Sequence, residues 1–290
     1  MTQDPSADPS GPAASRPPGE ATREPSAPSE RTWLEATWSE RAALGSHGEV
    51  TAYCHRGVWL IEVEGDYGAV TDDVDLAIQM ALAECPRGVV CSLMRPPQGQ
   101  GASQLIDRLA SAGRHVRRWP GTPIVVVCHD RATLDTLGLR PDGQYLGHSS
   151  SLLKAWARIS TQESGRTAHQ RLSPDDLASR TARQFLSRVC TGWGLGQHVP
   201  SGTIIVSELV TNAVQHAGGH VDVFLAEHAG GLRVAVRDRD STSPVTPHID
   251  PESLKGRGLR IVQTLAQSSG ALPAAGGGKL VWAVLGPQTR

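Results

Sequence analysis

The chain has 290 residues, which is enough for two domains of ordinary size at ~100–200 residues each. Its formal net charge of −1 gives no basic excess for nucleic acid, and its five cysteines form no CxxC pair that would suggest a zinc site. The cysteines lie mostly in apolar runs and indicate buried thiols in a reducing compartment. The N-terminus lacks the pattern of a signal peptide, and no apolar run approaches the ~20 residues of a membrane span. We therefore expect a cytoplasmic protein without direct nucleic-acid or membrane contacts.

The first 164 residues divide into a tail and a predicted α/β domain. Residues 1–31 are rich in Pro, Ser, Ala and Glu, cannot bury enough apolar surface to fold, and are predicted to be disordered. In the domain at 32–164, strand-like and helix-like segments alternate, which favours a small, partly parallel sheet covered by helices. Arg56-Gly57 joins the first two strands as a hairpin turn, and Thr71 is the expected N-cap of the first helix. The predicted strands are 50–55, 58–63, 88–94 and 123–128, and the predicted helices are 72–85, 103–115, 132–137 and 150–159.

A polar link at 161–167 leads into a second predicted domain, residues 165–290. Its first helix is expected over 173–193, with Ser173 as N-cap and Asp175 and Asp176 in the first turn, where acidic groups suit the helix dipole. The remaining predicted elements are helices at 201–217 and 257–266, strands at 220–226, 232–237 and 279–285, and a Pro- and Ser-rich loop at 238–255.

The helix at 201–217 carries the first motif, SELVTNAVQH. Glu208, Asn212 and His216 follow one another at intervals of four residues, so they share one face of the helix and can converge on one ligand. The rows beginning at Ile205 and Val206 are apolar and are expected to pack on the sheet. A carboxylate beside an amide oxygen suits Mg²⁺ and its phosphate ligand. Taken alone, the motif is weak, because a charged helix face is more often simply solvated.

Two further motifs follow along the chain. In VAVRDRD an apolar strand ends at Asp238, whose carboxylate could accept a hydrogen bond from an exocyclic amine such as that of adenine, or could simply cap a turn. In GRGLRIV, Gly256 and Gly258 open a helix whose bare N–H groups can approach a phosphate, and Arg257 and Arg260 add charge. A GxG sequence before a helix is common, so neither motif is specific alone.

The order and spacing of these motifs, followed by GGGKLVWAVL, resemble the N, G1 and G2 boxes and closing strand of the GHKL superfamily, the histidine-kinase-like ATPases, over about residues 167–290. The resemblance implies a Bergerat-type α/β sandwich with helices on one face of a mixed sheet, and binding of ATP with Mg²⁺. It makes Glu208 the catalytic or water-orienting base, Asn212 the Mg²⁺ ligand and Asp238 the adenine-reading acid. The other nucleotide-binding residues that it implies are His216, Gly256, Arg257, Gly258, Leu259 and Arg260.

Two features narrow the branch to the anti-sigma-factor serine kinases. The preceding segment is α/β and offers no helical hairpin with a phosphoacceptor histidine, and the lid at 240–255 is short. Two positions depart from the family pattern: no glycine follows Asp238 in the G1 box, and Leu280 stands where the family often has a threonine whose hydroxyl helps to bridge to the base.

The first domain resembles a STAS domain, the fold of the protein substrates of these kinases, in its order of elements. An active member would carry a phosphoacceptor serine after the strand that ends near Met94. The corresponding stretch, RPPQGQGASQ, has only Ser103, without an acidic neighbour, and we expect Ser103 to serve as a helix N-cap. The domain therefore resembles a degenerate partner that docks or regulates.

Two functions follow as hypotheses. The first is a serine/threonine kinase of partner-switching type that phosphorylates a STAS-domain antagonist, with Glu208 assisting deprotonation of the substrate hydroxyl. The second is a nucleotide-gated binding protein that sequesters a sigma factor or a STAS partner without turnover. Inhibition of the second domain by the first in cis is a third idea. A homodimer is compatible with the resemblance, although the sequence shows no dimer seam.

Overall fold

The computed structural model describes residues 50–64, 67, 69–119, 121–162, 165–216, 219–238, 257–275 and 277–287, apart from the side chains of Gln100, His216 and Arg257. The predicted tail at 1–31 and the predicted lid at 240–255 lie outside these residues, as do residues 163 and 164 at the predicted domain boundary. Each of the two parts of the chain contains one five-stranded sheet. We call residues 50–162 the N-terminal unit and residues 165–287 the C-terminal unit.

The sheet of the N-terminal unit has the order β1-β2-β3-β4-β5. Its first two strands form the predicted hairpin, and Arg56 and Gly57 both take the positive φ that such a turn requires. The other neighbouring pairs are parallel, as the alternation of strands and helices predicts. The strands are β1 Val50–His55, β2 Val58–Val63, β3 Gly88–Leu93, β4 Ile124–Val127 and β5 Gly147–Ser149.

Helices cover both faces of this sheet, because its strands carry apolar side chains on both faces. Trp59, Ile61 and Cys91 belong to the core beneath α2, α3 and α4, whereas Leu60 and Val90 pack beneath α5. These helices are α2 Thr71–Ala83, α3 Gln100–Arg118, α4 Arg131–Gly138 and α5 Leu152–Thr161.

Two predicted caps in this unit are wrong. Thr71 is the first residue of α2, and its hydroxyl donates to the carbonyl of Tyr67. Ser103 lies exposed inside α3, which begins three residues earlier after Gly99, with no side chain capping it. A preference for hydroxyl residues at caps does not fix where a helix begins when the preceding residues can also adopt helical angles.

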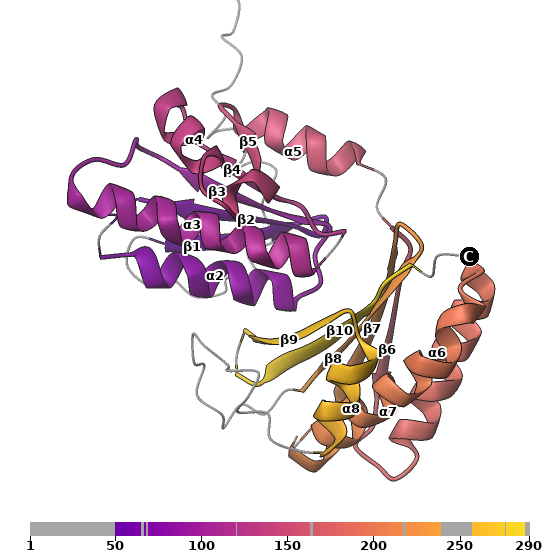
Figure 1. Cartoon of the computed structure of the whole chain (residues 1–290). Helices are drawn as coiled ribbons and strands as arrows, with labels where there is room; N and C mark the ends of the chain where they lie inside the picture. Colours follow the sequence, from indigo (N-terminus) through magenta and orange to yellow (C-terminus); the bar gives the residue numbers. More distant parts are fainter. Residues whose placement is uncertain are drawn as a thin grey trace, which may run out of the picture.

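The C-terminal unit is a two-layer sandwich whose sheet has the order β6-β7-β8-β10-β9, antiparallel in every pair. The described helices of this unit lie on one face of the sheet (Figure 1), which confirms the predicted α/β class and the one-sided arrangement of helices. The strands are β6 Thr167–Leu172, β7 Val221–His228, β8 Gly231–Arg237, β9 Ser268–Pro273 and β10 Lys279–Leu285. The helices are α6 Ala178–Trp193, α7 Val199–His216 and α8 Arg257–Leu265.

The entry into α6 differs from the prediction. Ser173 does not cap the helix, which begins only at Ala178. Instead the carboxylate of Asp175 accepts a hydrogen bond from the N–H of Leu177 at 2.9 Å, and the backbone of residues 173–177 makes a turn before the helix. The predicted polar link also ends earlier than expected, because Thr167 is already the first residue of β6.

The second face of this sheet is covered by the N-terminal unit (Figure 1). One continuous core contains Ala235, Leu272 and Leu280 from the sheet together with the buried residues of α2 and α3. At its centre the rings of Trp119 and Trp282 meet edge to face at 5.2 Å, and they are 1% and 3% exposed. The two units are therefore joined by apolar packing of the kind found inside a domain.

A buried ion network crosses the same face. Arg237 of β8 pairs with Glu84, which follows α2, at 2.6 Å and with Asp222 of β7 at 3.3 Å. Asp222 has no exposed surface and also accepts hydrogen bonds from His169 and Arg171 of β6. Burial alone would raise the pKa of Asp222, but these hydrogen bonds and the charge of Arg237 outweigh it and hold that pKa well below its usual range.

Candidate functional site

The helix that carries the first motif, α7, is fixed between the sheet and α6. Its two apolar rows are buried against the sheet as predicted, with Ile205, Val206 and Val210 fully inaccessible. On the side toward α6, Arg183 donates to the hydroxyl of Ser207 at 3.1 Å. Glu208 and Asn212 lie one turn apart on this helix, both half-buried. Packing on two sides thus sets the direction of the face that carries them.

Glu208 faces the first turn of α8. A Cβ at Gly258 would lie well inside contact distance of Oε2 of Glu208 and 3.2 Å from its Cδ. Only a glycine therefore allows the backbone at the start of α8 to come this close to the carboxylate. Among the described residues, Glu208 and Asn212 have no hydrogen bond or ion pair of their own. The structure thus brings the first and third motifs together around a carboxylate that is unpaired among the described residues.

Asp238 follows β8 and is 2% exposed. Its Oδ1 accepts the backbone N–H of Lys279 at 2.9 Å, and its Oδ2 lies 2.9 Å from Nζ of the same residue. Gly278 has φ +79°, and a Cβ there would lie 2.6 Å from the carbonyl oxygen of Asp238. A carboxylate has about four lone-pair positions, so Asp238 keeps acceptor capacity beside these two donors. The GGGK stretch thus supplies both the close turn and the cation that hold Asp238, a role that we had not predicted from the sequence.

Strand alternation decides which side chains face the helices. Val234 and Val236 belong to the core beneath α6 and α7, so Asp238 continues the row on the helix side of β8. Leu280, by contrast, belongs to the core shared with the N-terminal unit. The expectation that Leu280 removes a hydroxyl from the nucleotide site is therefore wrong, since the residue of β10 that faces the helices at this level is Val281.

The topology places the remaining predicted residues at the same end of the sandwich. α7 ends at His216, and a short connection leads to Val221, the first residue of β7, beside the end of β8 where Asp222 pairs with Arg237. The end of β8, the C-terminal turns of α7 and the first turn of α8 therefore meet. Of the other predicted residues, Leu259 is half-buried against the helix-side core and Arg260 is exposed. Gly256 and the side chains of His216 and Arg257 lie outside the described residues.

The side chains at this end of the sandwich suit a nucleotide better than a metal ion held by protein ligands alone. Within the described parts of the chain, no group of three or more His, Cys, Asp or Glu side chains could hold a metal ion. An amide such as that of Asn212 suits Mg²⁺ when phosphate oxygens and water complete the octahedron, so a protein cage is not required. Gly258, close to Glu208, and a buried acid at Asp238 are features that fit a nucleotide.

No helix among the described residues is long and apolar enough to cross a membrane.

Comparison with known proteins agrees with this geometry. Residues 172–285 match the family model described as the histidine kinase-like ATPase domain. The match begins at the last residue of β6 and ends at the last residue of β10, so it covers nearly all of the C-terminal unit. No curated protein matches the chain. The C-terminal unit is therefore similar to a histidine kinase-like ATPase, which supports an ATP-binding regulatory function.

Proposed function

We propose that the protein is an ATP-dependent serine/threonine kinase of anti-sigma-factor type that acts in the cytoplasm on a small STAS-domain antagonist. The observation that carries this proposal is the position of the Glu208 carboxylate, held against the glycine turn that opens α8. A carboxylate in that place can accept the proton that a substrate hydroxyl loses. The match to the histidine kinase-like ATPase domain supports the nucleotide part of the proposal.

The roles of the other residues follow from their positions. Asn212 would hold Mg²⁺, Asp238 would accept a hydrogen bond from the adenine amine, and the first turn of α8 would offer N–H groups to the phosphates. ATP, when bound, supplies the γ-phosphoryl group. Arg260 is exposed beside this turn and would add positive charge. In phosphoryl transfer the protein acts mainly by positioning and charge stabilisation, which suits a site with one base and several donors.

A second candidate is a binding protein that sequesters a sigma factor or STAS partner when nucleotide is bound, without turnover. The sequence after Asp238 favours it, because no glycine follows in the G1 box, where the family that the chain resembles usually has them. The N-terminal unit covers one face of the second sheet, so a partner protein cannot bind to that face. We therefore expect a partner to approach from the side of the helices.

The full-length protein, incubated with labelled ATP, Mg²⁺ and candidate STAS proteins, separates the two candidates. For a kinase, label appears on a serine or threonine of one partner, and Glu208→Gln abolishes the transfer while ATP affinity stays within a few-fold. The control is Asp176→Asn, which removes an exposed carboxylate before α6 and should leave the transfer unchanged. ATP binding without any transfer from the wild type would leave the nucleotide-gated binding protein, and absence of ATP binding would refute both.

A further inference from the structure

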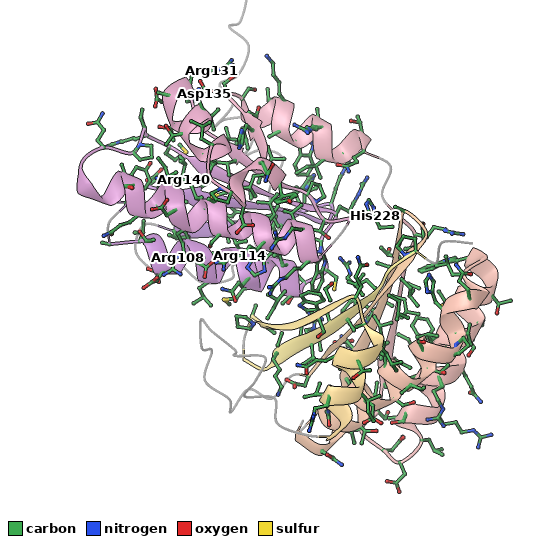
Figure 2. The ribbon with its side chains drawn as sticks, in the orientation of Figure 1. Arg108, Arg114, Arg131, Asp135, Arg140 and His228 are labelled. Carbon is green, nitrogen blue, oxygen red and sulfur yellow. The ribbon has the colours of Figure 1, made fainter. Side chains whose placement is uncertain are left out.

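A cavity lies between the two units, at the opposite end of β8 from Asp238. It has a volume of about 290 Å³ and is bordered by the end of α3, the β7–β8 hairpin and the last residues of β10. A Cβ on Gly121 would lie 3.2 Å from Cβ of His228, which borders the cavity, so the units are in close contact there. His228 lies at the tip of the hairpin, next to the N-terminal unit (Figure 2). We call this cavity the junction pocket.

The charged side chains that line the junction pocket are basic. Arg117 and Arg118 of α3, Arg233 of β8 and His228 border it, and none of the described carboxylates does. Arg117 lies 3.7 Å from Asp142 and is half exposed, which leaves it only weakly paired. Arg118 has no carboxylate partner among the described residues. The pocket therefore concentrates positive charge from both units in a small volume.

Arg233 is the most deeply buried of these basic residues, and its buried positive charge is hard to explain without a ligand. It is 6% exposed, donates from Nη1 to the hydroxyl of Thr122 at 3.3 Å, and lies 4.2 Å above the ring of Trp119. Burial lowers its pKa to about 10, so the guanidinium stays charged at neutral pH. The nearby thiol of Cys85 has its pKa raised to about 11 by burial and offers no negative charge at that pH.

The same strand provides an internal comparison. Arg237 lies four residues further along β8, on the same face and equally buried, but it has carboxylate partners in Glu84 and Asp222. Arg233 has no such partner within the described part of the chain. A buried charge without a counter-charge is costly, and stacking on one tryptophan and one neutral hydrogen bond offset only part of that cost. In place of a carboxylate, Arg233 has a cavity beside it, whereas Arg237 does not border this cavity.

We propose that the junction pocket binds a small phosphate-bearing anion, with the phosphate group between Arg233 and the two arginines of α3. Arginine forks match the oxygens of a phosphate, and three cationic groups suit a doubly charged anion better than a single carboxylate. The volume is slightly below the ~300 Å³ at which pockets for drug-sized ligands begin, so the ligand is a free phosphate or a small phosphomonoester. Because its contacts come from both units, bound anion links the two.

Calorimetric titration of the full-length protein tests this proposal, with inorganic phosphate, pyrophosphate and glycerol 3-phosphate as probes. Binding of phosphate and pyrophosphate alone identifies a free anion as the ligand, and binding of glycerol 3-phosphate as well, which lacks the adenine that the proposed ATP site would read, identifies a phosphomonoester. Arg118→Gln removes an exposed charge from the rim and is expected to weaken binding by about 10-fold or more, the usual effect of losing a hydrogen bond to a charged group. Arg233→Met is expected to abolish binding.

Two control variants make the result specific. Arg114→Gln changes another exposed arginine of α3 that does not border the junction pocket and lies well away from His228 (Figure 2), so binding should be unchanged. Arg260→Gln removes a charge from the proposed ATP site, and anion binding in the junction pocket should also be unchanged in this variant. If Arg233→Met does not fold, Arg118→Gln still decides the question. Absence of binding to the wild type, equal binding by Arg118→Gln, or loss of binding in Arg260→Gln instead would overturn the proposal.

Discussion

The apolar contact between the two units predicts that they unfold together. The substitution Trp282→Ala tests this prediction, because it removes a large side chain from that contact. Trp282 is 3% exposed, and its ring meets that of Trp119 at 5.2 Å. Within the described part of the chain, the buried indole N–H of each has no hydrogen-bond partner, so substitution removes packing and the ring contact without leaving a polar group behind. The loss should be about 3–5 kcal/mol, the usual cost of truncating a buried tryptophan. The ring pair should account for about 0.5–1.5 kcal/mol of it.

Urea unfolding of the full-length protein, followed by circular dichroism and by tryptophan fluorescence, measures both quantities. We expect one transition for the wild type and a midpoint lowered by on the order of 1–2 M in Trp282→Ala. A double-mutant cycle with Trp119→Ala should show the ring-pair coupling. Trp193→Ala is the control, because this half-buried tryptophan at the end of α6 packs against Arg166 within the C-terminal unit and should show no coupling to Trp119. Two separate transitions in the wild type, or a cycle without coupling, would refute the shared core.

Three further outcomes are expected. The folded pKa of Asp222 lies below its unfolded value of about 3.9, because the hydrogen bonds and charge that it meets outweigh burial, so its contribution is present above about pH 4 and is lost as the pH falls further. Urea unfolding at neutral and acid pH should therefore show that the free energy of unfolding depends less on pH in Asp222→Asn than in the wild type. Gly278→Ala should destabilise the fold by more than about 1 kcal/mol in thermal unfolding, because φ is +79° and the added Cβ meets Asp238. Gly258→Ala should crowd Glu208 and lower phosphotransfer by about 100-fold, and unchanged transfer would contradict the proposed geometry.

The sequence predicted the interior strands of both sheets and the edge strand β1, but it missed the other three edge strands. Gly88–Leu93 is apolar and fully buried, so a continuous run reveals it. Thr167–Leu172 and Ser268–Pro273 are edge strands of the second sheet. Edge strands have a solvated side and need few apolar residues, and TAHQRL and SSGALP accordingly resemble loops. Gly147–Ser149, at the edge of the first sheet, was missed for the same reason.

The candidate site was predictable as a set of motifs but not as a set of contacts. The spacing of Glu208 and Asn212 on one helix follows directly from helical geometry. The approach of Gly258 to Glu208, and the pairing of Lys279 with Asp238, join segments about 40–50 residues apart by a tertiary arrangement that no local pattern contains. The effect of Leu280 was misjudged because a family motif gives the residue and not the face of the strand on which it lies.

The outer face of the second sheet shows why a polar pattern can mislead. In GLRVAVR the arginines at 233 and 237 alternate with apolar residues, a pattern that predicts a strand with one solvated side. Both are buried because the N-terminal unit covers that side, so each needs a partner that the strand itself cannot provide. Glu84 comes from the opposite unit to serve Arg237. Arg233 meets no carboxylate in the described structure and borders a cavity instead, so its counter-charge is expected to be a ligand. The covering unit thus creates both the need for this anion and the space in which it would bind.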